Sequence, residues 1–299
     1  MSEYHIPVLL NESIDGLNIK KGGVYVDVTF GGGGHSAEIL RRLEGGRLFA
    51  FDQDEDALEN KIQDSRLQLI HHNFRYLSNF IRYHNEEKID GLLADLGVSS
   101  HEFDEGERGF SFRFDADLDM RMNRNIKFKA SDILNEYSDK DLYYIFRNYG
   151  EIKNTGKLVK LIVSHREENR IETTQDFREV IDSCIPKNKE NRYLAQVYQA
   201  LRIEVNSELD ALKEMLEQAA DLLKKGGRLS VITYHSLEDR LVKNFFRSGN
   251  FEGKVEKDFY GNVQTCFKLI NKKVITPSEE ELKLNNRARS AKLRIVEKI

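Results

Sequence analysis

Four consecutive glycines, Gly31 to Gly34, are the feature of this sequence that most directly indicates a ligand-binding site. Glycine allows a sharp turn and a close approach of the main chain to a ligand, because it carries no Cβ. Asp52 follows Gly31 by 21 residues, where a carboxylate typically accepts hydrogen bonds from two ribose hydroxyls. The N–H groups that open the helix after such a loop suit an anionic ligand end. The spacing therefore predicts a ligand that combines a ribose with a compact polar end.

The residues around the glycines form the elements that would position them. Residues 24–28 contain three alternating valines and have the composition of a strand. Residues 35–43 have helical spacing, and residues 47–51 predict a second strand that ends at Asp52. Together they make one βαβ unit, with the ligand site at the carboxyl edge of its strands.

Two cofactor classes fit such a loop. The dinucleotide fingerprint G-x-G-x-x-G is matched at Gly31 and Gly33, but its third position is Ser36. The run DVTFGGGGHS, in which Asp27 precedes the loop, favours S-adenosylmethionine instead. A tight turn with no ligand accounts less well for Asp52 at the expected distance.

Length and composition limit the class of protein. A chain of 299 residues, 39% hydrophobic and 32% charged, predicts one large or two moderate globular domains. No apolar run approaches the roughly 18–20 residues of a membrane span, and the N-terminus does not resemble a signal peptide. The only cysteines, Cys184 and Cys266, cannot alone form a disulfide framework or a zinc site. We therefore expect a cytoplasmic protein without a metal.

Polar and aromatic residues stand at the ends of further predicted strands. Apolar runs predict strands at residues 67–71, 88–96 and 228–233, and short helices are expected at 55–62 and 75–84. Phe74, Asp95 and His235 lie at or just after the ends of the three strands. Because the carboxyl ends of parallel strands meet at one edge, these side chains are candidates for the same site. Taken alone, Phe74 fits ordinary core packing better, and Asp95 as a loop cap or His235 as a structural histidine fits equally well.

The last part of the chain predicts a return to the sheet. Residues 206–223 predict an amphipathic helix that Gly226 and Gly227 end. Ser236 is the expected N-cap of the next helix, with Asp239 three residues on. One or two strands, forming an edge hairpin, are expected within 250–270. The chain then closes with a basic cluster that offers phosphate contacts or a solvated tail: Arg287, Arg289, Lys292 and Arg294.

Residues 103–205 interrupt the strand pattern and predict an inserted helical subdomain. Helical stretches are expected at 139–149, 152–169, 175–184 and 192–204, the third of them capped by Thr174. The insertion is rich in arginine and phenylalanine: Arg108, Arg113, Arg121, Arg124, Arg147, Arg166, Arg170, Arg178, Arg192, Phe110, Phe112 and Phe114. Such residues bind phosphates and stack on bases, but the sequence alone somewhat favours the solvated, charged face of a helical bundle.

Several longer motifs resemble one family. They are HIPVLLNE at 5–12, DVTFGGGGHS at 27–36, DLGVSS at 95–100, GFSF at 109–112, LDMRM at 118–122, QALRIEVNSEL at 199–209, GGRLSVITYHSLEDRLVKNFF at 226–246 and RARSAKLR at 287–294. Together they resemble the bacterial methyltransferases that modify the N4 amine of a cytidine in 16S ribosomal RNA. The resemblance covers almost the whole chain.

The resemblance implies a fold and a set of site residues. The fold is an α/β, doubly wound, mostly parallel Rossmann-like methyltransferase sheet with an inserted helical subdomain. Residues 1–102 and 206–299 would form the S-adenosylmethionine-dependent domain, and residues 103–205 the substrate-recognition domain. The implied cofactor contacts are Gly33, Gly34, His35, Asp52, Phe74, Asp95 and Glu102, and the implied catalytic residues are Asp95, Asn206 and His235. Glu102 stands where the family usually has glutamine, so it can accept hydrogen bonds but not donate them.

The implied partner is 16S rRNA within the small ribosomal subunit. A net charge of −4 argues against tight nonspecific binding to naked RNA and suits a structured ribonucleoprotein better. Three alternatives remain: a methyltransferase of a small molecule or protein, a nicotinamide-dependent oxidoreductase, and a cofactor-binding module without catalysis. The sequence leaves open whether the chain forms a homodimer.

The target atom can be argued from the chemistry of methyl transfer. Methylation of cytosine C5 requires a cysteine that adds to the ring, and neither Cys184 nor Cys266 is expected at the active edge of the sheet. An exocyclic amine requires acceptors that hold its N–H groups and turn its lone pair toward the methyl group. Asp95 and the backbone of residues 96–100 are the candidates.

Overall fold

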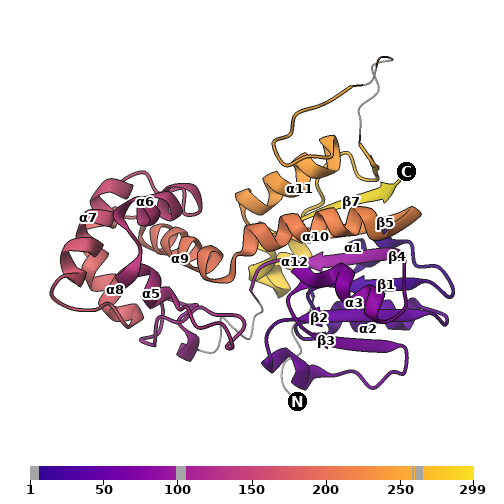
Figure 1. The fold of residues 1–299 in the computed structure, drawn as a ribbon, viewed down its shortest axis with the longest axis horizontal. Helices are drawn as coiled ribbons and strands as arrows, with labels where there is room; N and C mark the ends of the chain where they lie inside the picture. The colour runs from indigo at the N-terminus through magenta and orange to yellow at the C-terminus, as the bar shows by residue number, and fades with distance from the viewer. Residues whose placement is uncertain (1–6, 99–105, 258, 260–264) are drawn as a thin grey trace. The chain divides into compact units, whose positions relative to one another are not determined.

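The computed structural model describes residues 7–98, 106–257, 259 and 265–299 (Figure 1). The chain divides into two compact units, Met1–Gly97 with Leu209–Ile299, and Val98–Glu208. We call them the sheet unit and the helical unit. The sequence places the two boundaries at 102/103 and 205/206, a few residues from these positions.

The described part of the sheet unit contains one seven-stranded sheet, with strand order β3-β2-β1-β4-β5-β7-β6. The strands are β1 Val24–Asp27, β2 Arg47–Asp52, β3 Leu67–His71, β4 Ile89–Asp95, β5 Leu223–Thr233, β6 Phe267–Leu269 and β7 Lys292–Lys298. The first five pair in parallel, and β7 is antiparallel to both neighbours. The chain winds from β1 outward through β2 and β3, then back to β4 and β5. The predicted doubly wound, mostly parallel fold is confirmed, with its switch point between β1 and β4.

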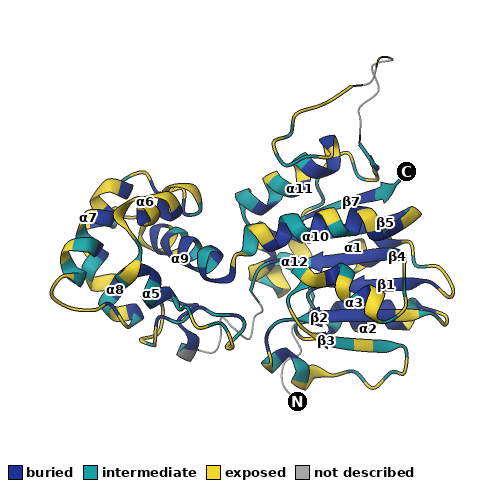
Figure 2. Ribbon diagram, viewed as in Figure 1, coloured by how far each residue is buried: buried dark blue, intermediate teal, exposed yellow. Residues whose placement is uncertain are grey.

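Helices cover both faces of this sheet. They are α1 Leu10–Leu17, α2 Gly34–Arg42, α3 Leu77–Tyr83, α10 Glu208–Leu222, α11 Ser236–Ser248 and α12 Glu279–Leu284, with 3₁₀ turns at Asp56–Asn60, Phe74–Tyr76 and Asn286–Ser290. Helices α1 and α2 pack on one face, and α3, α10 and α11 on the other. The central strands are therefore buried on both sides, as Figure 2 shows for β1 and β4. This explains why they read as continuous apolar runs.

The helical unit is built as the sequence predicts, with one addition. Its helices are α5 Ala130–Glu136, α6 Asp139–Asn148, α7 Thr155–Arg166, α8 Thr174–Ile181 and α9 Glu190–Asn206, of which α5 was not predicted. They enclose an apolar core of their own. The predicted cap Thr174 is wrong by one residue, because Thr173 accepts from the Asp176 N–H in a reciprocal capping box. No helix within the described ranges is both long and apolar enough to cross a bilayer.

Two expectations about the return to the sheet are wrong. Gly226 and Gly227 do not end a helix in a loop, because α10 passes directly into β5 and both glycines lie within that strand. The pairing of β4 with β5 shifts register beside them, which glycine tolerates. Ser236 is not the N-cap of α11. His235 occupies that position, and Glu238 rather than Asp239 completes the capping box.

The C-terminal segment is a strand rather than a solvated tail. One strand, β6, lies within 250–270 as predicted, but in the described part of the chain its partner is β7, which lies between β5 and β6, rather than a second strand of the same segment. Leu293 and Val296 are fully buried, and burying such a side chain stabilises the fold by about 1.5–3 kcal/mol. Arg294 and Lys292 contact the Asp239 carboxylate at 2.8 and 3.4 Å. These charges alternate with the apolar residues and gave the segment the appearance of a basic tail.

Candidate functional site

Three acidic residues end three adjacent strands at the switch point. Asp52, Asp27 and Asp95 are the last residues of β2, β1 and β4, which lie side by side in the sheet. Tyr234 follows β5, and Phe74 begins the 3₁₀ turn that comes soon after β3. The structure therefore brings the ends of five parallel strands to one edge, as the sequence predicts.

The glycine loop between β1 and α2 meets this edge with its backbone. Gly33 has φ +76° and is the N-cap of α2, a conformation that favours glycine. A Cβ at Gly34 would lie 2.2 Å from Cγ of Pro7, so the N-terminal segment packs directly on the start of the helix. Among the residues that the structure describes, a Cβ at Gly31 or Gly32 would meet nothing within 4 Å. The loop therefore borders open space where a ligand can approach the main chain.

Asp52 holds the loop while keeping acceptor capacity. Its Oδ2 accepts from the Gly31 N–H at 2.8 Å, and its Oδ1 accepts from the Asp54 N–H at 2.9 Å. Each carboxylate oxygen has a second lone pair, so two further donors can bind. Burial raises the pKa of Asp52 to about 6, although the two N–H groups lower it. Asp52 therefore becomes a full acceptor only above that pH.

Asp95 is held by groups from both sides. Its N–H donates to Thr29 Oγ1 at 2.7 Å, and its Oδ1 accepts from the Tyr234 hydroxyl at 2.7 Å. Its Oδ2 lies 3.8 Å from His35 Nδ1, and the side chain is 22% exposed. Burial raises the pKa of Asp95 to about 6, against the lowering effects of His35 and of the Tyr234 hydrogen bond. The carboxylate is thus fixed in position and still reachable.

Asp27 connects the glycine loop to Asp95. It is fully buried and accepts from the Ser36 hydroxyl at 2.7 Å and the Thr29 N–H at 3.1 Å. The Thr29 hydroxyl, which accepts from the Asp95 N–H, lies 3.4 Å from Asp27 Oδ1. Burial raises the pKa of Asp27. Asp27 therefore acts as a buried support for the loop rather than as a ligand contact.

His35 and Phe74, two of the predicted cofactor contacts, are at the expected edge. His35 is buried in the first turn of α2, with Nε2 3.1 Å from the Val8 carbonyl. Phe74 is partly buried against the core of the sheet unit. The turn that begins at Phe74 is capped by Asn73, whose amide donates to Gln53 Oε1 at 2.7 Å. This contact joins the end of β3 to the residue after Asp52.

The remaining predicted site residues have different surroundings, although His235 does follow the end of β5 as the sequence predicts. Asn206 belongs to the helical unit, where it accepts from the Met122 N–H at 2.8 Å and donates to the Met120 and Arg202 carbonyls. His235 caps α11, with Nε2 3.1 Å from Glu238. Asn206 and His235 both make structural contacts, and a catalytic role for either stays a prediction. Glu102 lies outside the described residues.

Most arginines of the helical unit have partners within it. The Arg108 and Arg166 guanidinium groups donate to backbone carbonyls, and Arg121, Arg170 and Arg178 pair with carboxylates. Of its predicted aromatic residues, Phe110 is buried and Phe112 packs against Tyr198, whereas Phe114 is 51% exposed. The arginine and phenylalanine content therefore reflects the construction of the unit to a large extent.

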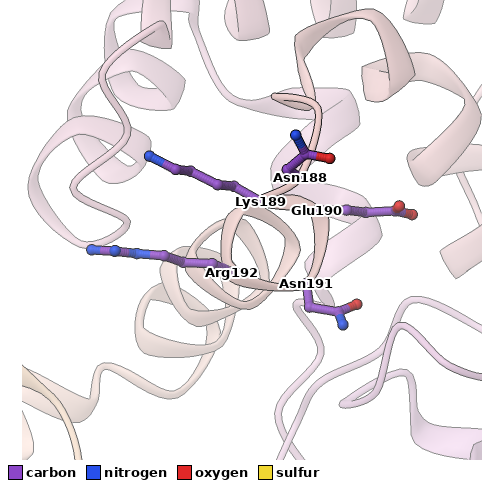
Figure 3. A pocket seen from close by; sticks show the side chains of 5 residues that line it. All are labelled: Asn188, Lys189, Glu190, Asn191 and Arg192. Carbon is purple, nitrogen blue, oxygen red and sulfur yellow. The ribbon is translucent and has the colours of Figure 1, made fainter.

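One polar hollow lies at the start of α9. It is lined by Asn188, Lys189, Glu190, Asn191 and Arg192. Figure 3 shows the Lys189 and Arg192 side chains extending in the same direction, away from Glu190 and Asn191. Both cations are exposed. In the C-terminal cluster, Arg287 and Arg289 are exposed, whereas Lys292 and Arg294 contact Asp239.

Tyr234 is the residue at this edge that the sequence did not assign. Its position directly after β5 was a signal, because β5 pairs with β4 and both strands end at the same edge. What the sequence does not contain is the hydrogen bond to Asp95, 139 residues away.

The arrangement fits a cationic ligand that carries a ribose. Asp52 offers lone pairs at the end of β2, beside a loop that leaves the main chain open. Asp52 and Asp95 are negatively charged near pH 7, because their pKa values lie at about 6. S-Adenosylmethionine has ribose hydroxyls, an ammonium group and a sulfonium, all of which this edge would bind as donors or cations.

Comparisons with known proteins agree with this geometry. A family model described as the MraW methylase family matches residues 2–299. A protein named Ribosomal RNA small subunit methyltransferase H from Christiangramia forsetii is 58% identical over 300 residues, covering 100% of this chain and 99% of that protein. Proteins with the same name from Flavobacterium johnsoniae (58% identity, 99% of this chain and 98% of that protein) and Bacteroides thetaiotaomicron (59%, 99% and 97%) also match. The chain therefore belongs to the MraW methylase family.

Proposed function

We propose that this protein transfers a methyl group from S-adenosylmethionine to the exocyclic N4 amine of a cytidine in 16S rRNA of the small ribosomal subunit. The observation that carries the proposal is the Asp95 carboxylate, fixed by Thr29 and Tyr234 next to the glycine loop. The relatives' names support the RNA substrate. Membership in a methylase family leaves no role for hydride transfer, so the nicotinamide alternative is dropped.

The cofactor contacts follow from the edge of the sheet. When bound, S-adenosylmethionine supplies an electrophilic methyl group on a sulfonium. Asp52 would accept from its ribose hydroxyls, and the backbone of Gly33 and Gly34 would approach its polar end. Phe74 offers a ring against which adenine can pack.

The nucleophile requires an acceptor rather than a strong base. The lone pair of the cytidine N4 amine is delocalised into the ring, so an acceptor must hold an N–H and turn the lone pair toward the methyl group. Asp95 Oδ2 makes no hydrogen bond within the described part of the chain and can take this role. The ionised carboxylate stabilises the positive charge that develops on the amine as it accepts the methyl group, and the amine then loses one proton to solvent water.

The cysteines argue against methylation at C5. Cys266 precedes β6, which β7 separates from β5, and it lies level with the amino end of β5, at the edge opposite Asp95. Cys184 is buried, and burial raises the pKa of its thiol, so little thiolate forms near pH 7.

We place the enzyme in the cytoplasm, where small ribosomal subunits are found. Within the enzyme, we assign cofactor binding to the sheet unit and substrate recognition to the helical unit. Support comes from the exposed Phe114, Lys189 and Arg192, which can stack on bases or pair with phosphates. Arg289 of the sheet unit is a further exposed cation.

Labelled S-adenosylmethionine should transfer its methyl group to small ribosomal subunits purified from a strain that lacks this protein. Nucleoside mass analysis is expected to find the label in N4-methylcytidine. Label in another nucleoside would contradict the base assignment. Absence of transfer despite measurable cofactor binding would contradict the RNA substrate and favour a small molecule or a protein. Isolated rRNA, assayed in parallel, decides whether the assembled subunit is required.

Cofactor affinity should fall as the pH is lowered through 6. Asp52 and Asp95 have pKa values raised to about 6, so below that pH each is protonated and loses acceptor capacity and charge. A carboxyl group with a pKa of about 6 is ionised in only about a tenth of the molecules at pH 5. If only the ionised form binds S-adenosylmethionine well, the Kd should rise at least about tenfold between pH 7.5 and pH 5. Calorimetric titration measures this change. A Kd that is constant over this range, in protein that circular dichroism shows to be folded, would contradict the assignment.

A further inference from the structure

Tyr234 is fixed at both its backbone and its side chain. Its N–H donates to Glu238 Oε2 at 3.0 Å, and Glu238 is buried in the first turn of α11. Its ring lies 3.4 Å from where a Cβ on Gly97 would be, and Gly97 has φ +107°. Its hydroxyl reaches Asp95 Oδ1 at 2.7 Å. The ring thus spans from the end of β5 to the end of β4 in one defined orientation.

This contact makes the two oxygens of Asp95 unequal. Oδ1 accepts a short hydrogen bond from Tyr234, and the backbone N–H of Asp95 is anchored on Thr29 Oγ1. These two contacts fix the plane of the carboxylate. Oδ2 is left with His35 Nδ1 at 3.8 Å, which is beyond hydrogen-bond distance.

We propose that Tyr234 is a positioning residue that directs Asp95 Oδ2, rather than Oδ1, at the amine to be methylated. The inference rests on the proposed function and adds a residue to it. Tyr234 acts through Asp95 and need not touch the substrate. If the Tyr234 ring only filled space, phenylalanine could replace it without loss of activity, because the ring and its contact with Gly97 would be unchanged.

The tyrosine also affects the charge of Asp95. The groups that face Asp95 are His35 from α2, Asp27 from β1, Glu238 from α11 and Tyr234 itself. His35 and Tyr234 favour the ionised carboxylate, whereas Asp27 and Glu238 disfavour it. Burial and the neighbouring acids raise the pKa of Tyr234 well above its ordinary value, so its hydroxyl stays a donor throughout the range of the assay. Loss of that donor should raise the pKa of Asp95.

The test is Tyr234→Phe, assayed on small ribosomal subunits across pH 5.5–9. We expect kcat at pH 7 to fall about tenfold and the acid limb of the profile to move up by about one pH unit, with partial recovery at pH 9. The KM for S-adenosylmethionine should change less than threefold. The matched control is Tyr25→Phe, which removes another buried hydroxyl of the sheet unit, one that accepts from the Lys20 N–H. The control should lower stability without moving the profile.

A double-substitution cycle separates positioning from general damage. Because Tyr234 acts through Asp95, Tyr234→Phe should cost little further activity in an Asp95→Asn background. The inference would be overturned if the activity losses of the two single variants multiplied in the double variant. It would also be overturned if the acid limb did not move in Tyr234→Phe, or if it moved equally in Tyr25→Phe. Absence of transfer by the wild-type protein would instead overturn the proposed function. Thermal denaturation of every variant shows whether a loss reflects unfolding.

Discussion

Asp95→Asn is expected to lower kcat for methyl transfer by about a thousandfold, while the Kd for S-adenosylmethionine rises less than tenfold. Asparagine keeps an oxygen that can accept from Tyr234, but it places an NH₂ group where Oδ2 stood. A donor then faces the N–H of the substrate amine, and the negative charge that stabilises the developing cation is lost. Removal of one such stabilising group typically costs about 10²–10³ in kcat, and repulsion between the two donors adds to that. Single-turnover assays on small subunits, with calorimetry for the cofactor, measure the two quantities separately.

The control for Asp95→Asn lies on the same strand. Asp90, near the amino end of β4, accepts from the Val24 N–H at 2.9 Å and pairs with Lys224. Asp90→Asn should retain nearly full activity, because it lies at the opposite edge of the sheet. If Asp95→Asn stayed within tenfold of the wild-type kcat, Asp95 would not be the acceptor of the amine. A loss confined to cofactor affinity would make it a cofactor contact only.

The central sheet could be predicted because its signals are local. Strands β1, β2 and β4 are mostly apolar and β3 alternates apolar with polar residues, and glycines, acids and polar loops mark where they end. In a parallel sheet, knowing where strands end is enough to know which side chains share an edge. For that reason the sequence alone is enough to place Asp52 and Asp95 at one edge of the sheet.

What escaped prediction depends on partners distant in sequence. Strand β7 alternates apolar residues with Lys292 and Arg294, and only Asp239 on α11 shows why those cations are there. The role of Tyr234 depends on its hydrogen bond to Asp95, which is remote in sequence but lies at the end of the neighbouring strand β4. The caps of α8 and α11 were each misplaced by one residue, because neighbouring residues can cap a helix and backbone dihedrals decide between them.

The arginines of the helical unit show that composition can also suggest a binding surface that long-range pairing reduces. Their number suggested an RNA-binding surface, yet Arg121 and Arg178 pair with acids, and Arg166 donates to the Leu134 and Tyr137 carbonyls at the end of α5. Composition counts charges without showing which are already paired. The exposed residues Phe114, Lys189 and Arg192 therefore form a smaller and more testable set than the full sequence list.

Asp52→Ala is expected to raise the Kd for S-adenosylmethionine about hundredfold at pH 7.5. Two charge-assisted hydrogen bonds to ribose would be lost, each worth about 1.5–3 kcal/mol, and the lower limit of about 3 kcal/mol for the pair corresponds to roughly a hundredfold change in Kd. The Gly31 and Asp54 N–H groups would also lose their acceptor, which loosens the loop. Removing a buried carboxylate whose pKa is raised relieves a desolvation cost, and this opposes the loss of those bonds. The melting temperature should therefore change little while affinity changes greatly.

Asp64→Ala is the matched control in the sheet unit, and we expect it to change stability rather than cofactor affinity. Asp64 pairs with Arg66 just before β3, at the amino edge of the sheet, and that pairing lowers its pKa to about 2. Its removal takes away a favourable ion pair, so Asp64→Ala should lower the melting temperature and leave the cofactor Kd unchanged. Calorimetry and thermal denaturation of the two variants together distinguish a ligand contact from a structural acid. If Asp52→Ala bound S-adenosylmethionine as tightly as Asp64→Ala does, the ribose would have to be held elsewhere on the carboxyl edge. Asp52 would then serve only to shape the glycine loop.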